Sequence, residues 1–179
     1  MSQQFTIPTE FIELPSRGLL YPLDNPLSSG SIEMSYMTSR SEDILTNQNY
    51  IRQGIVLDKL IESLIVTKVN IDDIIIGDKN AILIASRILG YGKDYTFKTI
   101  DGQGNYIDKT IDLQTLKDKE LNPKDLSEER KNEFKFNLPN SGNEVTFKLL
   151  THGDDKKITQ EIEGLKKLFP QATPPELST

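Results

Sequence analysis

One histidine and two pairs of aspartates are the side chains of this sequence best suited to acid–base chemistry. His152 stands beside Gly153 where a predicted strand meets a predicted helix, and an imidazole there could titrate near neutral pH. Asp72-Asp73 and Asp154-Asp155 are adjacent carboxylates, which point away from each other on a helix. Because the spacing places no nucleophile or second cluster opposite them, we interpret the aspartates as helix starts and His152 as a surface or capping residue.

The run Gly90-Tyr91-Gly92-Lys93 has the composition of a phosphate-binding loop. Such a loop joins a strand to the N-terminus of a helix and carries Ser or Thr after its Lys. Here the run follows a predicted helix, precedes a predicted strand and continues with Asp94. The negative end of a helix dipole lies at that point, so we predict a helix C-cap and no nucleotide site.

An acidic run has nearly the spacing of a calcium-binding loop: Asp101, Gln103, Asn105, Asp108 and Asp112. The position that needs a glycine holds Tyr106 instead, and the last ligand position holds Asp instead of Glu. A turn explains the run better than a metal. We therefore expect no metal, no cofactor and no enzymatic activity.

Composition limits the kinds of partner. The chain has 179 residues and a net charge of -6, which argues against nucleic acid as a partner. It has no cysteine, so disulfides and thiolate metal sites are excluded. No apolar run approaches the length that spans a membrane. We expect an intracellular soluble protein that binds other proteins, with no membrane and no small-molecule substrate.

The stretch 38–89 has the most sustained helical periodicity. Ser39 and Glu42 have capping-box spacing, which predicts a helix that starts there and is broken at Gly54. A second helix is predicted over 56–65, where apolar residues recur at spacings of three and four.

Two further helices are predicted. Asp78 is a candidate cap for a helix over 79–89, which has little polar face and which Gly90 ends. The segment 154–169 has acidic residues at its start and lysines near its end, the order that the helix dipole favours, and Pro170 stops it.

Strands are predicted on both sides of the helical stretch. The segment 31–36 alternates apolar and polar residues and predicts a short strand. Two hairpins are predicted, over 95–113 around the turn 101–105 and over 133–150 around the turn 139–143. In the second hairpin, alternate apolar residues would share one face.

These elements predict an α+β fold in which a central helical group packs with short antiparallel β-hairpins. We expect an extended, proline-rich N-terminal arm over 1–30 that lies outside the core. The α+β core would span 31–152, with a charged surface linker over 116–130. A C-terminal helix and short tail would occupy 153–179.

The arm is the predicted partner-binding site. The segment Pro15-Ser16-Arg17-Gly18 has turn composition and separates two apolar groups. Those groups could lie on the chain's own core or dock on a neighbouring subunit. The candidate partner-binding residues are Phe11, Ile12, Leu14, Pro15, Arg17, Gly18, Leu19, Leu20 and Tyr21.

The order of several segments resembles the baseplate hub and hub-assembly family of T-even-like contractile-tailed bacteriophages. These segments are 12–22, 36–45, 58–61, 134–139 and 145–149. The resemblance implies a structural or chaperone-like role in tail assembly, with other baseplate or hub proteins as partners and no catalytic residues. It also implies a location in the host cytoplasm during assembly or in the tail baseplate of the virion.

The sequence departs from the family pattern in two places. Some relatives carry a cysteine pair in the first hairpin that forms a zinc knuckle, whereas 101–105 offers no such ligand, so no metal is implied. The pattern also continues beyond Thr179 into another helical region. The alternative function is a stand-alone intracellular adaptor that binds peptides by strand addition at a hairpin edge.

Overall fold

The computed structural model describes residues 7–118 and 130–169 and confirms the α+β class. The helices are α1 Ser39–Leu45, α2 Gln48–Arg52, α3 Val56–Leu64, α4 Ile76–Tyr91 and α5 His152–Leu168. The strands are β1 Thr9–Glu13, β2 Ser31–Ser35, β3 Asp94–Ile100, β4 Tyr106–Asp112, β5 Phe134–Asn137 and β6 Glu144–Phe147. Three short 3-10 turns are η1 Pro26–Ser29, η2 Ile71–Asp73 and η3 Leu113–Thr115. Every strand pairing among these elements is antiparallel.

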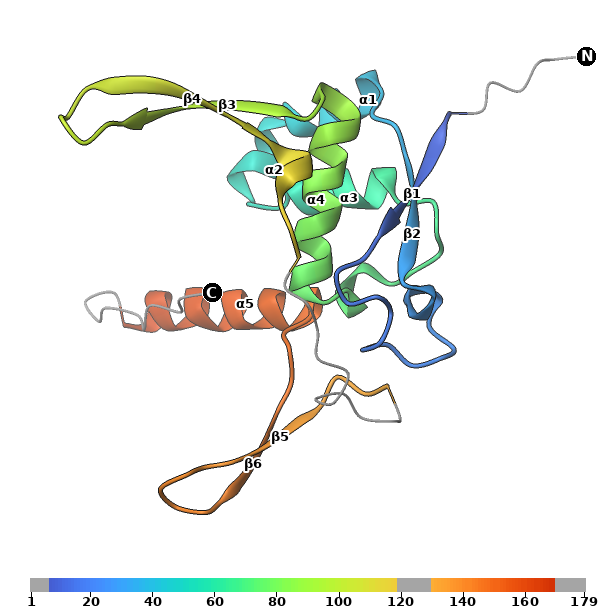
Figure 1. Cartoon of the computed structure of the whole chain (residues 1–179), viewed down its shortest axis with the longest axis vertical. Helices are drawn as coiled ribbons and strands as arrows, with labels where there is room; N and C mark the ends of the chain where they lie inside the picture. Colours follow the sequence, from blue (N-terminus) through green and yellow to red (C-terminus); the bar gives the residue numbers. More distant parts are fainter. Residues whose placement is uncertain (1–6, 119–129, 170–179) are drawn as a thin grey trace, which may run out of the picture.

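The long helix α4 is the axis of the arrangement (Figure 1). The β3–β4 hairpin leaves the body at the C-terminal end of α4, while α5 and the β5–β6 hairpin lie near its N-terminal end. The Ile76 amide donates to the Leu150 carbonyl at 3.0 Å, and Ile75 forms an isolated antiparallel bridge with Thr151. The start of α5 is therefore attached to the start of α4.

The N-terminal segment contributes directly to the hydrophobic core. Its buried residues are Leu14, Leu20, Tyr21 and Leu27. They pack in one cluster with β2, α3, α4 and the chain around η2, where the buried residues are Ile32, Met34, Leu60, Ile61, Leu64, Ile74, Ile75 and Ile82. The prediction that the arm lies outside the core is wrong for residues 14–27, because apolar side chains of this size are stabilised by leaving water. The alternative placement on the chain's own core is confirmed for Leu14, Leu20 and Tyr21, whereas Phe11 is exposed.

Strand β1 was not anticipated from the sequence. It pairs with β2 so that Ile12 lies opposite Ile32 and Phe11 opposite Glu33. The predicted strand over 31–36 is confirmed, ending one residue earlier than expected. A bridge between Met34 and Ile65 joins β2 to the end of α3, so this small sheet is attached to the helical body.

The predicted turn after Pro15 is confirmed and fits closely against η1. The Arg17 amide donates to the Leu14 carbonyl at 2.8 Å, and both Arg17 and Gly18 have positive φ, 51° and 72°. A Cβ at Gly18 would collide with the backbone oxygen of Ser28 and lie 2.6 Å from the Gly30 amide nitrogen. Only glycine fits this approach of two backbone segments.

The first predicted helix is in fact two. Thr38 is the N-cap of α1, and its capping box is made with Ser41, so the predicted Ser39–Glu42 pairing is wrong. The break falls at Asn47, well before Gly54, because the Asn47 side chain accepts from the Asn49 and Tyr50 amides of α2 and starts a new helix there.

Helices α3 and α4 follow their predicted segments with one correction. Helix α3 buries Leu60, Ile61 and Leu64 on the predicted face. Helix α4 begins at Ile76, before the expected cap at Asp78. The Asp78 carboxylate does not cap the helix because it accepts hydrogen bonds from the N-terminal segment in the core.

Both hairpins are confirmed, and the C-terminal helix starts earlier than predicted. Phe134 lies opposite Phe147 and Phe136 opposite Val145, which places the apolar residues of β5 and β6 on one face. Helix α5 begins at His152, with Thr151 as its cap. Most of the predicted linker lies at 119–129, outside the described residues.

Candidate functional site

The buried Asp78 joins the N-terminal segment to α4. Its Oδ2 accepts from the Tyr21 hydroxyl at 2.6 Å and its Oδ1 from the Ser16 amide at 2.9 Å. The Tyr21 oxygen in turn accepts from the Ile75 amide at 3.0 Å. Burial, and then the nearby Asp78 carboxylate, raise the pKa of Tyr21 well above its usual range. Because all these groups are satisfied by one another, they stabilise the fold and offer nothing to a ligand.

His152 lies in a second buried cluster, at the point where α3, α4 and α5 meet. Its Nε2 is 3.3 Å from Asp58 Oδ2, and its Nδ1 is 2.9 Å from Lys79 Nζ. Lys79 Nζ is also 2.9 Å from Asp58 Oδ1. The His152 side chain is only 2% exposed. The expectation of a surface or capping histidine is wrong, because the tertiary fold closes over the first residue of α5.

This cluster contains the imidazole and the carboxylate of a catalytic triad, His152 and Asp58, but no nucleophile beside them among the described residues. A carboxylate beside an imidazole can orient a general base, but the second imidazole nitrogen here faces the Lys79 ammonium and no nucleophile. Burial and the Lys79 charge lower the pKa of His152, and the Asp58 carboxylate only partly offsets them. We interpret the cluster as the attachment of α5 to the body. The absence of enzymatic activity stays a prediction.

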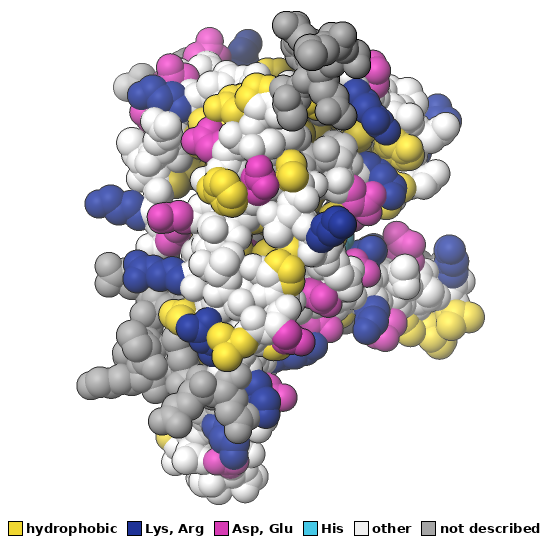
Figure 2. Space-filling view, turned by 90° about the vertical axis from the view of Figure 1, so that its right-hand side faces the viewer, with side chains coloured by type: hydrophobic (Ala, Val, Ile, Leu, Met, Phe, Trp, Pro, Cys, Tyr) yellow, Lys and Arg dark blue, Asp and Glu magenta, His cyan; other side chains and the backbone are white. Residues whose placement is uncertain are grey.

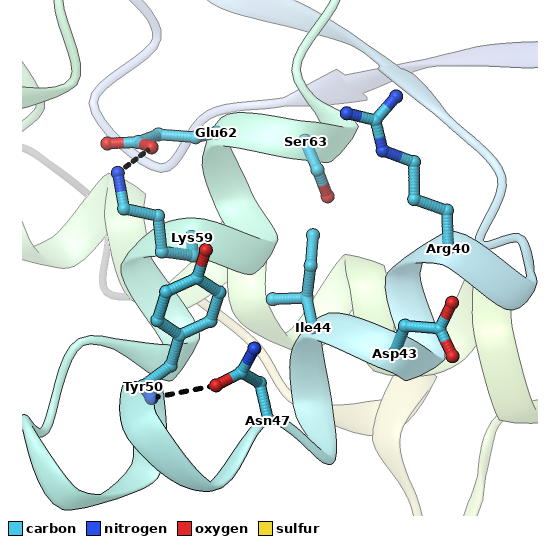
Figure 3. A pocket seen from close by; sticks show the side chains of 8 residues that line it. All are labelled: Arg40, Asp43, Ile44, Asn47, Tyr50, Lys59, Glu62 and Ser63. Atoms are coloured by element: carbon cyan, nitrogen blue, oxygen red, sulfur yellow. Dashed lines mark hydrogen bonds and ion pairs between the residues drawn. The ribbon is translucent and has the colours of Figure 1, made fainter.

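A cleft of about 410 Å³ opens between α1, α2 and α3 (Figure 3). Its lining residues are Arg40, Asp43, Ile44, Asn47, Tyr50, Lys59, Glu62 and Ser63. Lys59 Nζ is 2.6 Å from Glu62 Oε2. The Ser63 hydroxyl donates to the Leu60 carbonyl at 2.7 Å, which leaves it turned toward its own helix. The cleft therefore presents mixed charge and no paired nucleophile and base.

A second cleft, of about 390 Å³, brings together residues that the sequence analysis kept apart. Asp72 and Asp73 line it together with Asp154 and Lys156. Lys156 Nζ lies 2.9 Å from Asp72 Oδ1. Its positive charge offsets the repulsion between the Asp72–Asp73 pair and Asp154. The expectation that no second cluster faces either aspartate pair is wrong, since η2 packs against the start of α5.

The charges of this second cleft serve helix capping. The Thr151 hydroxyl accepts from the Asp154 amide, and the Asp154 carboxylate accepts from the Thr151 amide, which forms a capping box. Hydrogen bonds from Lys148 and then Thr151 lower the pKa of Asp154 to about 2. Among residues 7–118 and 130–169, no group of three or more His, Cys, Asp or Glu could hold a metal ion.

The β5–β6 hairpin carries an exposed apolar face. Phe136 is 52% exposed and Phe147 is 51% exposed. Other exposed apolar residues of this hairpin and the segment after it are Leu138, Val145, Leu149 and Leu150. Figure 1 shows that the hairpin projects away from the helical body. A lone two-stranded hairpin is only marginally stable in water, so this face is suited to a partner that covers it.

The β3–β4 hairpin projects in the same manner at the other end of α4. Its exposed apolar residues are Tyr95, Ile100, Tyr106 and Ile107. The Arg87 guanidinium lies 4.9 Å from the centre of the Tyr91 ring and 5.8 Å from that of Tyr95, which attaches the hairpin root to α4. The sheet has two strands, so the outer edges of β3 and β4 have no strand neighbour among the described residues.

The predicted partner-binding residues of the N-terminal segment divide into two groups. Leu14, Gly18, Leu20 and Tyr21 are buried, so they cannot contact a partner in the folded chain. Pro15 and Leu19 are partly buried, as is Ile12, which packs against the core cluster. Phe11, which is 69% exposed, and Arg17 remain available at the surface.

The hairpin faces were not predicted as binding surfaces, although the sequence carried the signal. The alternation at Phe134, Phe136 and Leu138 gave the shared face correctly. What it could not give is whether another part of the chain covers that face, because coverage depends on tertiary packing.

One face of the molecule shows both signs of charge (Figure 2). On the face drawn in Figure 2, Lys and Arg side chains alternate with Asp and Glu side chains, and apolar side chains lie between them. A single-sign basic patch, the usual footprint of a nucleic-acid-binding protein, is not visible on that face. No helix within the described part of the chain is both long and apolar enough to pass through a membrane.

Comparison with known proteins gave no relatives. No protein-family model matches the chain, and no curated protein or solved structure matches it.

Proposed function

We propose that this chain is a bacteriophage baseplate hub protein, either a structural subunit or an assembly chaperone of the hub, and that it acts by binding other phage proteins. Its partners are other baseplate or hub proteins. It acts without catalysis, in the host cytoplasm during assembly or in the tail baseplate of the virion.

The apolar face of the β5–β6 hairpin is the observation that carries this proposal. Two of its three phenylalanine rings, Phe136 and Phe147, are each about half exposed on an element that projects from the body. Exposed aromatic residues on a projecting element are typical of a protein-binding surface. The clefts add no competing chemistry, since their charges are paired or mixed.

The resemblance supplies the phage context. Its first and third segments meet in the core, where Leu20 and Tyr21 belong to the same buried cluster as Leu60 and Ile61. Its last segments form the β5–β6 hairpin, whose apolar face is the proposed docking surface. The resemblance therefore covers both the framework and the surface that the proposal uses.

The adaptor function remains the second candidate because the hairpin edges are open. Strand addition needs an edge with unpaired backbone groups, and two-stranded sheets provide edges on both sides. In that case backbone pairing would matter most, and replacing apolar side chains on one face would have little effect.

The test compares two double variants in infected cells. Phe136→Thr/Val145→Thr replaces one of the two cross-strand apolar pairs of this face while keeping residues that favour strands. Lys135→Thr/Glu144→Thr is the matched control on the opposite face, where these two side chains form an exposed ion pair at 3.0 Å. Each tagged chain is purified from infected cells, and co-purifying proteins are identified by mass spectrometry.

We expect the wild type and the control to recover baseplate or hub proteins, and the face variant to recover at least tenfold less. Mass spectrometry of finished virions and of tail intermediates then separates the two roles. Presence in finished tails indicates a subunit, and presence only in intermediates indicates a chaperone. Recovery of no tail protein by the wild type would refute the phage assignment, and equal recovery by both variants would favour strand addition.

A further inference from the structure

Helix α5 carries an apolar stripe with coiled-coil spacing. Ile158, Ile162 and Leu165 follow one another at intervals of four and three residues, and Phe169 continues the pattern four residues later. Alternating intervals of four and three define the a and d positions of a heptad. The stripe therefore has the geometry that packs one helix against another.

The stripe lies on the side of α5 opposite its contacts with η2. Ile158 and Ile162 are partly buried, and Leu165 is 49% exposed. The opposite side of α5 makes the intramolecular contacts, where Lys156 pairs with Asp72 and Gly153 lies against the Asp72 backbone. Residues two or five positions along a helix lie on roughly opposite sides. Ile158 is two positions from Lys156, so η2 does not cover the stripe, whose exposed fraction is greatest at Leu165 and beyond.

The outer half of α5 is exposed on nearly every side. Leu165 is 49% exposed, Leu168 is 72% exposed, and both follow Gly164, a poor helix former. A Cβ at Gly164 would meet no atom within 4 Å. A helical segment that contains a glycine and whose apolar stripe is only partly covered gains little stability by itself, because helices in water depend on packing.

Charges beside the stripe indicate which helix would cover it. Glu161 and Lys166 occupy the flanking g and e positions, and neither has an ion-pair partner among the described residues. In a parallel, in-register pair of α5 helices, Glu161 of each copy lies beside Lys166 of the other. In an antiparallel pair, the two charges lie on opposite sides of the seam and do not meet.

We infer that α5 is a self-association element, in which two copies of this chain pair through parallel α5 helices along Ile158, Ile162 and Leu165. The pairing is isologous, so the Glu161–Lys166 contact occurs twice about a two-fold axis. Because the seam spans only about two heptads, the dimer is weak and concentration-dependent. This pairing does not depend on the proposed role in the phage baseplate.

Single cysteines test the geometry, since the chain has none of its own. In a parallel pair, the two copies of residue 165 face each other across the seam. Leu165→Cys should therefore form a disulfide-linked dimer under mild oxidation. Glu163→Cys, which lies outside the seam, is the matched control and should cross-link at least tenfold less. Equal cross-linking of the two variants would overturn the inference.

Charge reversal tests the register in the full-length chain by analytical ultracentrifugation between roughly 10 µM and 1 mM. We expect Glu161→Lys and Lys166→Glu each to weaken dimerisation about tenfold, and the double reversal to restore it. Glu163→Lys, the same charge change outside the seam, should leave the dimer unchanged.

Two outcomes would contradict the pairing. A wild-type chain that stays monomeric across this concentration range refutes self-association. This holds even if the stripe proves to bind a different protein. A dimer that persists unchanged in Leu165→Lys, with helix content intact by circular dichroism, places the interface elsewhere on the molecule.

Discussion

The Tyr21 hydroxyl connects a buried side chain, that of Asp78, to a buried backbone amide, that of Ile75. It donates to Asp78 and accepts from the Ile75 amide, and all three residues lie in the core. Buried groups of this kind cost free energy when they lose a partner, because no water replaces it. A small change at Tyr21 therefore has a large effect.

We predict that Tyr21→Phe lowers the free energy of unfolding by about 1–3 kcal/mol, since it leaves Asp78 Oδ2 and the Ile75 amide without that partner. Tyr36→Phe is the matched control. The Tyr36 hydroxyl also donates to a carboxylate, Glu10, but that pair is exposed, and we expect a much smaller change than in Tyr21→Phe. Urea denaturation of both variants measures the difference, and equal effects would contradict the role of burial.

The charge state of His152 couples stability to pH. Burial first, and the Lys79 ammonium second, lower the pKa of His152, so the folded state disfavours the imidazolium. An unfolded histidine has a pKa of about 6.5. The unfolded chain therefore binds more protons than the folded chain once the pH falls below about 6.5, and the free energy of unfolding falls with it.

We predict that the free energy of unfolding falls between pH 7.5 and pH 5.5 and that His152→Gln removes most of this slope. This window lies above the usual range of carboxylate pKa values, including that of Asp154, which is about 2. The charged groups that act on the imidazole are Lys79, Asp58, Lys156 and Asp72. Asp72→Asn, at an exposed ion pair in the same region, is the control that should keep the slope. A slope unchanged in His152→Gln would refute this assignment.

At the scale of elements, the turn after Pro15 depends on one close backbone approach. Gly18 has φ of 72° and its α-carbon lies against the Ser28–Gly30 backbone at the end of η1. A side chain there would both strain φ and push two backbone segments apart. The positions of Leu20 and Tyr21 in the core follow from this turn.

We predict that Gly18→Ala lowers the free energy of unfolding by at least about 2 kcal/mol, because backbone cannot yield as a flexible side chain can. Gly102→Ala is the control, since its φ is not positive and a Cβ there meets nothing within 4 Å. Thermal unfolding followed by circular dichroism measures both. An unchanged free energy of unfolding in Gly18→Ala would show that the turn and η1 can move apart without loss of stability.

Elements with local signals could be predicted from the sequence. The hairpins depend on turn residues between alternating strands, and in the second hairpin the apolar alternation gave the shared face. Strand β1 and the role of Asp78 could not be predicted, because Ile12 pairs with Ile32 and Asp78 with Tyr21 across long stretches of chain. Asp78 has the composition of a helix cap, but its tertiary contacts with Ser16 and Tyr21 override that preference.

The candidate surfaces show the same division. The apolar alternation of β5 was visible in the sequence, whereas the burial of Leu14, Leu20 and Tyr21 was not. Apolar residues in a proline-rich segment fit either a partner's surface or the chain's own core. Only the closure of the N-terminal segment over α4 distinguishes the two.

At the scale of the whole molecule, stability is distributed unevenly. The core lies around α3, α4 and the N-terminal segment, while both hairpins project with largely exposed side chains (Figure 1). Segments with few buried apolar contacts open locally at lower free energy than the core does.

We predict that backbone amides of β5 and β6 exchange with deuterium at least about tenfold faster than those of α3 and the first half of α4 in the isolated chain. Addition of a partner that covers the β5–β6 face should slow exchange there and leave α3 unchanged. Hydrogen exchange followed by mass spectrometry measures both. Exchange that is equally slow in the hairpin and in α3 would contradict an exposed, loosely attached hairpin.

The contact between Tyr21 and Asp78 also orders the events of synthesis. These residues are 57 positions apart, so the N-terminal segment cannot reach its place in the core until α4 has left the ribosome. Until then Leu14 and Leu20 have nothing to cover them, and closing so long a loop costs entropy before any contact repays it. His152 arrives later still and joins Asp58 and Lys79 only after the framework exists. The nascent chain therefore exposes the apolar residues of its N-terminal segment until α4 emerges. Helix α5 then packs against a core that has already formed.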